Sequence, residues 1–230
     1  MKYIGAVMLL SIGMQAQAQF GVIQDKDGYT NVREGAGISR KIADKLQDGE
    51  VVYTWEQEGE WCNINYHRKN EIEGGFVHRS RIKMVNTFEK IKVRQQTETN
   101  VVFQQDSVTV MFTTRAFVEK DHQVHHGKSE EGFSFVEKID GKDFYGCDGG
   151  LPTREYNTFT IQIGNRAVAV PDKAIRDLYQ PNPELTEVFY DRKIDRLYII
   201  ASNSDGAGGY EVLFQFDRGV YTKRAIYYGF

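Results

Sequence analysis

Hydrophobic and polar residues alternate with a two-residue period along the first third of the chain. The clearest case is the stretch YTNVR at 29–33, where longer polar or aromatic side chains alternate with Thr30 and Val32. Such alternation is typical of a β-strand whose two faces meet different surroundings. Two further β-rich runs follow at 51–55 and 61–66, each after a glycine-containing turn pair. Short strands separated by glycine turns predict a small β-barrel or sandwich.

The alternation resumes at Val101 and continues toward the C-terminus. Its longest run covers residues 107–119, and the turn pairs Asp140-Gly141 and Gly164-Asn165 each separate two later β-rich runs. Dipeptides of this kind between β-rich runs indicate hairpins. The expected pairs are 133–139 with 144–145, 156–163 with 167–170, 187–190 with 196–201, and 210–216 with 220–228. About eight to ten strands predict a mostly antiparallel β domain over 99–230, either a sandwich or a barrel.

Two stretches interrupt this pattern. Residues 86–98 are polar and lack strand periodicity, so we expect a linker there. Residues 171–180, PDKAIRDLYQ, open with a proline and place Ala174 and Leu178 on one face of a helix. This arrangement predicts one short helix, ended by the prolines that follow. The expected fold class is therefore all-β, with a barrel over 19–85, a linker, and a β domain that carries a single helix.

The N-terminus has the composition of a secretory signal peptide. Lys2 precedes an apolar run at 3–14, and the small residues Ala16 and Ala18 form an A-x-A cleavage pattern. We therefore expect residues 1–18 to be removed and the mature protein to be periplasmic or secreted. The apolar run is shorter than the about 20 residues that span a bilayer, and no later segment is apolar enough, so no membrane span is expected in the mature chain.

The charge balance argues against nucleic acid as a partner. The whole chain has a formal charge of −3, and loss of Lys2 with the signal peptide makes it −4. General nucleic-acid binding requires a basic surface that releases counterions from the phosphate backbone.

Four motifs give residues 19–85 a family resemblance. They are DGYTNVR at 27–33, DGE at 48–50, GEWCNI at 59–64 and GGFVHRSRI at 74–82. In this combination the segment resembles a bacterial SH3 (SH3b) domain, with Phe76 where the family usually has tryptophan. The resemblance implies an SH3-like barrel and recognition of cell-wall peptidoglycan, chiefly of its peptide stems.

One face of the expected barrel combines aromatic rings with polar donors. Stacking rings with amide and guanidinium groups suit a peptide or glycan ligand. In the alternative interpretation, Asn31 and Arg33 hold the barrel together and Trp61 belongs partly to its core. The candidate ligand-binding residues are Tyr29, Asn31, Trp55, Trp61 and Tyr66.

Two glycine-rich loops distinguish the C-terminal half, GCDGGLP at 146–152 and SNSDGAGGY at 202–210. They are similar to the DGG-P and DGAG-Y signatures of an uncharacterised exported β domain of bacteria, which implies a shape and no chemistry. The candidate residues in these loops are Asp148, Asp205 and Tyr210. Two carboxylates serve acid–base chemistry or a hard cation. Asp-Gly pairs also form ordinary turns, and the spacing of a calcium loop is absent, so no metal or cofactor is assigned.

The cysteines and histidines leave alternatives open. Cys62 and Cys147 form either a disulfide or two separate buried thiols. Cys147 lies in a glycine loop without a helix behind it to lower its pKa, which disfavours a nucleophile. The H-x-x-H-H spacing of His122, His125 and His126 suits zinc, but the surrounding sequence favours a solvated loop.

These observations lead to three functional hypotheses. The leading one is an exported, non-enzymatic binding protein whose barrel recognises peptidoglycan while the C-terminal domain is a second interaction module. The second is a cell-envelope hydrolase, or its partner, with a site between the Asp148 and Asp205 loops. The third is a protein–protein interaction module that binds envelope proteins and not the wall. No catalytic motif is recognised in the sequence, so no catalytic residue is assigned.

Overall fold

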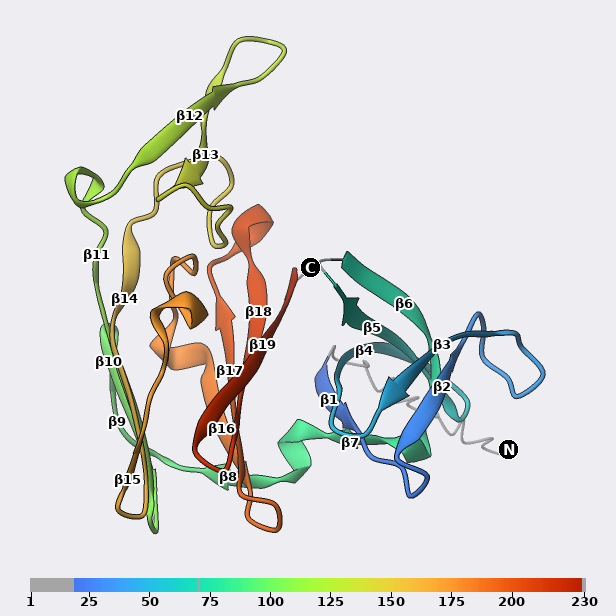
Figure 1. The fold of residues 1–230 in the computed structure, drawn as a ribbon. Helices are drawn as coiled ribbons and strands as arrows, with labels where there is room; N and C mark the ends of the chain where they lie inside the picture. The colour runs from blue at the N-terminus through green and yellow to red at the C-terminus, as the bar shows by residue number, and fades with distance from the viewer. Residues whose placement is uncertain (1–18, 70, 229–230) are drawn as a thin grey trace, which may run out of the picture. The chain divides into compact units, whose positions relative to one another are not determined.

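The computed structural model describes residues 19–69 and 71–228, and its regular structure is almost entirely β-strand (Figure 1). Contacts divide the chain into an N-terminal unit that ends at Lys83 and a C-terminal unit that begins at Met84. Within the described residues the helical segments are short 3₁₀ turns. The predicted all-β fold class is confirmed at this level. The signal peptide expected over 1–18 lies outside the described residues.

The N-terminal unit is a curled sheet of seven strands in the order β3-β2-β6-β5-β4-β1-β7. The pairings from β3 across to β1 are antiparallel. The strands are β1 Gln19–Ile23, β2 Tyr29–Arg33, β3 Ile42–Gln47, β4 Val51–Glu58, β5 Trp61–Arg68, β6 Glu71–His78 and β7 Ile82–Met84.

One face of this sheet is apolar and encloses its own core. Val32, Val52 and Ile64 lie on different strands, and each is 0% exposed. Full burial of an aliphatic side chain stabilises a fold by about 1.5–3 kcal/mol. The curl depends on Gly75, because a Cβ at this position would lie 2.4 Å from Val32 Cγ1. A glycine therefore lets β6 approach β2 at the Arg33–Phe76 pairing.

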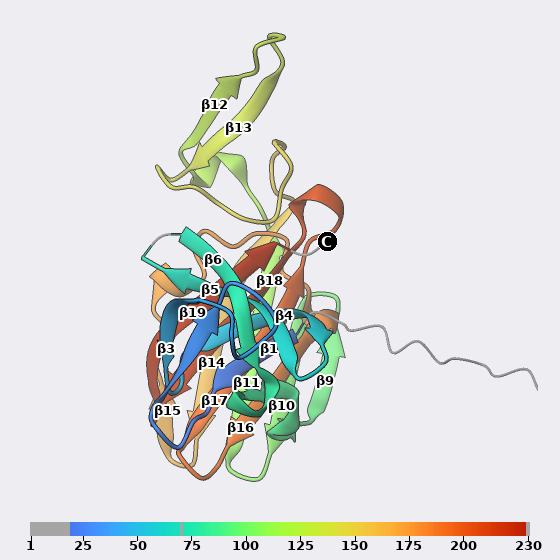
Figure 2. The same cartoon turned by 90° about the vertical axis from the view of Figure 1, so that its right-hand side faces the viewer.

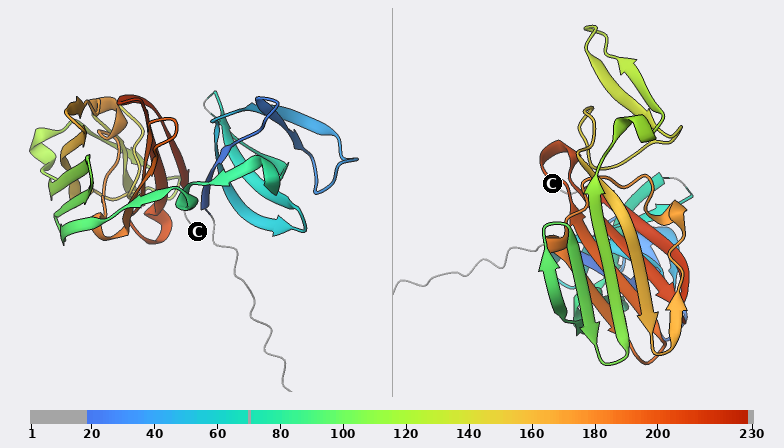
Figure 3. Two further views of the ribbon diagram at one scale, coloured as in Figure 1. Left: turned by 90° about the horizontal axis from the view of Figure 1, so that it is seen from below. Right: turned by 90° about the vertical axis from the view of Figure 1, so that its left-hand side faces the viewer.

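The C-terminal unit contains two five-stranded sheets and a separate hairpin. The first sheet has the order β15-β14-β11-β10-β9 and is seen face-on in the right panel of Figure 3; the second has the order β19-β18-β17-β16-β8. The hairpin β12–β13 extends beyond the end of the sheets (Figure 2). The strands are β8 Glu89–Ile91, β9 Val93–Thr97, β10 Asn100–Gln105, β11 Val108–Ala116, β12 Val124–Lys128, β13 Ser134–Ile139, β14 Arg154–Ile163, β15 Arg166–Val168, β16 Thr186–Asp191, β17 Arg196–Asn203, β18 Tyr210–Asp217 and β19 Val220–Tyr228.

The inward faces of the two five-stranded sheets form one core. Val110 of the first sheet and Leu197 of the second belong to the same cluster, and both are 0% exposed. Phe159 and Phe214 make an edge-to-face contact between the sheets, with ring centroids 5.7 Å apart. The expected hairpins β14–β15, β16–β17 and β18–β19 are confirmed.

The expectation of a structureless linker at 86–98 was wrong. This stretch contains β8, which pairs with β16, and β9, which pairs with β10. Every residue of β9 is exposed. An edge strand with solvent on both faces needs no alternation of apolar residues, and so the strand pattern is absent from its sequence.

The short helix expected at 171–180 was also wrong. Only Asp172–Ala174 forms a 3₁₀ turn. Further on, Leu178 makes a backbone bridge to Tyr145, and Tyr179 makes one to Glu155. These bridges use backbone groups that a helix would keep within itself. Ala174 and Leu178 are nevertheless buried, at 0% and 1% exposure. The spacing of these apolar residues therefore indicated correctly that they are buried, but not that they lie on a helix.

The Asp140-Gly141 turn forms, but its expected strand partner does not. Both residues have positive φ, 52° and 72°, as a tight hairpin turn requires. Strand β13 nevertheless pairs with β12 and not with 144–145. The polar segment with His125 and His126, which was expected to be a loop, therefore forms strand β12.

Candidate functional site

A groove of about 590 Å³ opens on the N-terminal unit and collects three of the five candidate ligand-binding residues. Tyr29 and Asn31 reach it from β2, and Trp61 from the beginning of β5. The other residues that line it come from β2 itself, from the turns beside these strands, from the end of β6 and from the 3₁₀ turn that follows it. They are Asp25, Asp27, Thr30, Arg33, Ile38, Glu60, His78, Ser80 and Arg81.

A partly buried ion pair supports the base of the groove. The carboxylate of Asp25, 4% exposed, accepts a hydrogen bond from Arg81 Nη1 at 2.8 Å and another from the backbone N–H of Asp27 at 3.0 Å. Asp25 N in turn donates to Asp48 Oδ1 at 2.7 Å. These bonds connect the first turn of the unit to the segment after β6, so the groove has a fixed shape.

Aromatic and cationic side chains form its walls. Lys45 Nζ lies 3.8 Å from the centre of the Tyr29 ring, and Tyr29 itself remains 38% exposed. Trp61 meets His78 edge to face, with centroids 5.4 Å apart. The Arg33 guanidinium lies 6.0 Å from the Trp61 ring, and its Nη1 donates to the Arg40 carbonyl at 2.6 Å. The rings are thereby held in place while part of their surface faces solvent.

The structure places Trp55 and Tyr66 outside this groove. Trp55 packs edge-on against Tyr53, with ring centroids 5.1 Å apart. Tyr66 is 3% exposed and belongs to the core, where burial raises the pKa of its hydroxyl to about 12. Tyr66 is therefore not available as a ligand contact.

The two glycine-rich loops of the C-terminal unit do meet. Asp148 and Asp205 line one hollow of about 370 Å³. Tyr210, by contrast, is 1% exposed and donates its hydroxyl proton to the Tyr179 carbonyl at 3.0 Å. Tyr210 is therefore a core residue and not a surface contact.

Both cysteines are free thiols. Burial raises the pKa of Cys147 to about 11 and also raises that of Cys62. Because a thiolate is the reactive form, neither residue has the lowered pKa of an activated nucleophile.

The three histidines are not gathered into one site. The side chain of His122 is only 8% exposed, contrary to the expectation of a solvated loop, and its Nδ1 lies 2.8 Å from Asp140 Oδ2. His125 and His126 are exposed on β12. Nowhere in residues 19–69 and 71–228 are three or more His, Cys, Asp or Glu side chains placed together to hold a metal ion.

The sequence did not single out several residues that line the groove of the N-terminal unit. His78, Ser80 and Arg81 belong to the closing motif, and Asp25 precedes the first turn, so all four lie within or beside recognised motifs. Their shared position was not foreseen because Asp25 and Arg81 are 56 residues apart.

Comparisons with protein-family models, with curated proteins and with solved structures found no match to this chain. In the part of the chain that the structure describes, no helix has the length and apolar character to cross a membrane.

Proposed function

We propose that this chain is an exported, non-enzymatic binding protein whose N-terminal unit is an SH3b-type barrel that recognises the peptide stems of peptidoglycan. The C-terminal unit is a second interaction module. The observation that carries the proposal is the groove of the N-terminal unit, in which Tyr29, Asn31 and Trp61 come together. Three of the four motifs that resemble the SH3b family, at 27–33, 59–64 and 74–82, supply most of its lining.

The chemistry of the groove suits a peptide. Exposed parts of the Tyr29 and Trp61 rings offer stacking surfaces, and Asn31 offers an amide that both donates and accepts hydrogen bonds. Asp27 has no ion-pair partner among the described residues and is available to a ligand amine. Arg81 is 36% exposed beside its partner Asp25 and is available to a carboxylate. A stem peptide carries an amine, carboxylates and backbone amides that can pair with these side chains.

The test is a titration of the chain with a soluble stem peptide, followed by tryptophan fluorescence. Trp61 lines the groove and Trp55 does not, so the variant Trp55→Phe leaves a single reporter at the site. Saturable change of the Trp61 emission is expected. Tyr29→Ala should weaken binding by about 0.5–1.5 kcal/mol, the value of one aromatic contact.

Phe133→Ala is the matched control, because it removes an aromatic ring that is 72% exposed in the C-terminal unit. It should bind as the parent does. A titration that leaves the Trp61 emission unchanged would refute stem-peptide recognition by this groove.

A further inference from the structure

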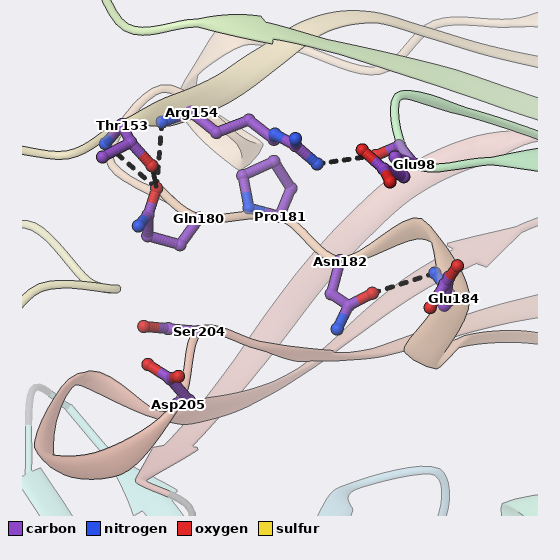
Figure 4. Close-up of a pocket in the computed structure, with 9 residues that line it drawn as sticks. All are labelled: Glu98, Thr153, Arg154, Gln180, Pro181, Asn182, Glu184, Ser204 and Asp205. Atoms are coloured by element: carbon purple, nitrogen blue, oxygen red, sulfur yellow. Dashed lines mark hydrogen bonds between the residues drawn. The ribbon is translucent and has the colours of Figure 1, made fainter.

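A second groove lies on the C-terminal unit, where four segments distant in sequence meet (Figure 4). Its volume is about 500 Å³, within the range typical of small-ligand sites. The segments are the turn between β9 and β10, the residues that begin β14, residues 180–184, and the loop after β17. Figure 4 shows residues from all four segments around the groove. We name it the loop groove; it is lined by Glu98, Thr153, Arg154, Gln180, Pro181, Asn182, Glu184, Ser204 and Asp205.

Gln180 fixes the shape of one wall. Its side-chain oxygen accepts three hydrogen bonds, from Thr153 N at 3.1 Å, Thr153 Oγ1 at 3.0 Å and Arg154 N at 2.9 Å. Its backbone N–H donates to the Arg154 carbonyl at 2.9 Å, and its carbonyl accepts from Ser204 N at 3.1 Å. Gln180 and Ser204 both have positive φ, 53° and 62°. The surrounding bonds hold both residues in a conformation that non-glycine residues rarely adopt.

Asn203 is not itself part of the lining, but it holds the lining residue Asn182 in place. The Asn203 side chain is 1% exposed, and its oxygen accepts from Asn182 N at 2.8 Å. Its nitrogen donates to the hydroxyls of Tyr156 and Tyr210, at 3.3 and 3.1 Å. The loop groove is therefore preorganised, which lowers the entropic cost of binding.

Its electrostatic character is acidic but not uniform. Glu98, Glu184 and Asp205 contribute three carboxylates, and none of them forms an ion pair with a described residue. Arg154 is the only cationic side chain that lines the groove, and its Nη1 donates to the Glu98 carbonyl at 2.7 Å. A phosphate or another multiply charged anion would meet net repulsion here, whereas an ammonium group would be attracted by carboxylates that have no ion-pair partner among the described residues.

The groove also presents donors. The side-chain oxygen of Asn182 accepts from Glu184 N at 3.0 Å, and the oxygen of Gln180 is taken by the bonds to Thr153 and Arg154. The NH₂ groups of these two amides have no partner among the described residues, and in Figure 4 the Asn182 nitrogen faces the open space of the groove. Together with Arg154 they offer hydrogen bonds to carbonyl oxygens.

The loop groove continues into the hollow beside Asp148, because Gln180, Ser204 and Asp205 line both. Four glycines line this extension, Gly146, Gly150, Gly206 and Gly208. Gly146 is required there, since its φ is +106° and a Cβ would lie 2.3 Å from the Tyr179 carbonyl oxygen. The combined shape suits an extended ligand better than a single ion.

We propose that the loop groove binds a short peptide that carries a free primary amine. The amine is attracted by the carboxylates of the lining, Glu184 and Asp205 among them, and the peptide carbonyls accept hydrogen bonds from Asn182, Gln180 and Arg154. This site belongs to the C-terminal unit and is independent of the function proposed for the N-terminal groove.

The test is isothermal titration of the full chain with the tripeptide Ala-Lys-Ala, and with the same peptide acetylated on both amines. The variants are Glu184→Gln and Asp205→Asn, whose side chains are exposed and are not needed for the fold. Glu130→Gln, in the hairpin tip outside the groove, is the matched control for loss of one negative charge.

The free tripeptide should bind, and the acetylated one should not. Each groove variant should weaken binding about two- to fivefold, as exposed charge pairs do, and Glu130→Gln and Tyr29→Ala should bind as the parent does. The proposal is overturned if the tripeptide gives no heat, if acetylation has no effect, or if Tyr29→Ala abolishes the heat and so locates it in the N-terminal groove. Stronger binding of Ca²⁺ alone, lost in Asp205→Asn, would identify a cation site and would overturn it equally.

Discussion

Replacing Asn203 with alanine should destabilise the C-terminal unit by about 3 kcal/mol. The side chain is 1% exposed and connects three segments through Asn182 N, Tyr156 Oη and Tyr210 Oη. Alanine would leave the Asn182 N–H and the Tyr156 hydroxyl without partners, and a buried polar group without a partner costs about 1–3 kcal/mol. Tyr210 would keep its bond to the Tyr179 carbonyl and adds little to this sum.

The chain offers a natural internal reference for the measurement. Its two tryptophans, Trp55 and Trp61, both lie in the N-terminal unit, so tryptophan fluorescence reports on that unit alone. Thermal unfolding followed by far-UV circular dichroism detects the C-terminal unit as well. For a unit of this size about 3 kcal/mol corresponds to a shift of roughly 6–12 °C, which should appear in the circular dichroism and not in the fluorescence.

Two smaller substitutions calibrate the effect. Tyr156→Phe removes only the long 3.3 Å bond to Asn203 and should cost about 1 kcal/mol or less. Asn157→Ala, on the exposed side of β14, should cost less than about 0.5 kcal/mol. If Asn203→Ala costs no more than Tyr156→Phe, then Asn203 does not hold Asn182 in place, and the loop groove is not preorganised through it.

Three further predictions follow from local geometry. Gly146→Ala should destabilise the C-terminal unit by roughly 2–4 kcal/mol in a denaturation assay, because the added Cβ would lie 2.3 Å from the Tyr179 carbonyl oxygen. The control is Gly164→Ala, whose Cβ would meet open space and which should cost about 1 kcal/mol in the same assay. Hydrogen bonding from Arg192 lowers the pKa of Glu89. The pair therefore stabilises the fold at pH values above the usual pKa of a glutamate, and this contribution is lost as the pH falls through the lowered pKa. Because the pair is partly exposed, Glu89→Gln should reduce the stability at pH 7 by less than about 0.5 kcal/mol and should not reduce it at pH 2. An equal loss of stability at both pH values would contradict a stabilising Glu89–Arg192 ion pair. Finally, thiol titration in denaturant without reductant should detect both cysteines, and the native protein at pH 7 should react slowly; absence of free thiols would mean a disulfide.

Periodicity alone was enough to predict much of the fold. Hairpins such as β14–β15 form because an apolar alternation on each side of Gly164-Asn165 leaves few other ways to bury one face. The strands that were missed lack this signal. Strand β9 exposes all of its side chains, and the backbone bridges of Leu178 and Tyr179 depend on partners distant in sequence.

The two-residue strand period also predicted part of the groove of the N-terminal unit. Tyr29 and Asn31 are two apart on β2 and share a face, which a strand guarantees. Trp61 and Tyr66 are separated by an odd number of positions on β5, so they lie on opposite faces, with Tyr66 in the core. The frame of the loop groove had no local signal, because nothing in the sequence around Gln180 or Ser204 indicates positive φ at a residue other than glycine.

Co-sedimentation with purified sacculi tests the proposed function most directly. The full chain is mixed with intact sacculi, alone and with an excess of soluble stem peptide as competitor, and the bound fraction is measured for the parent, for Tyr29→Ala and for Phe133→Ala. We predict that the parent and Phe133→Ala pellet with the sacculi, that Tyr29→Ala pellets less, and that the soluble stem peptide releases the parent. Retention that the competitor does not reduce, or no retention at all, would contradict stem-peptide recognition by the N-terminal unit.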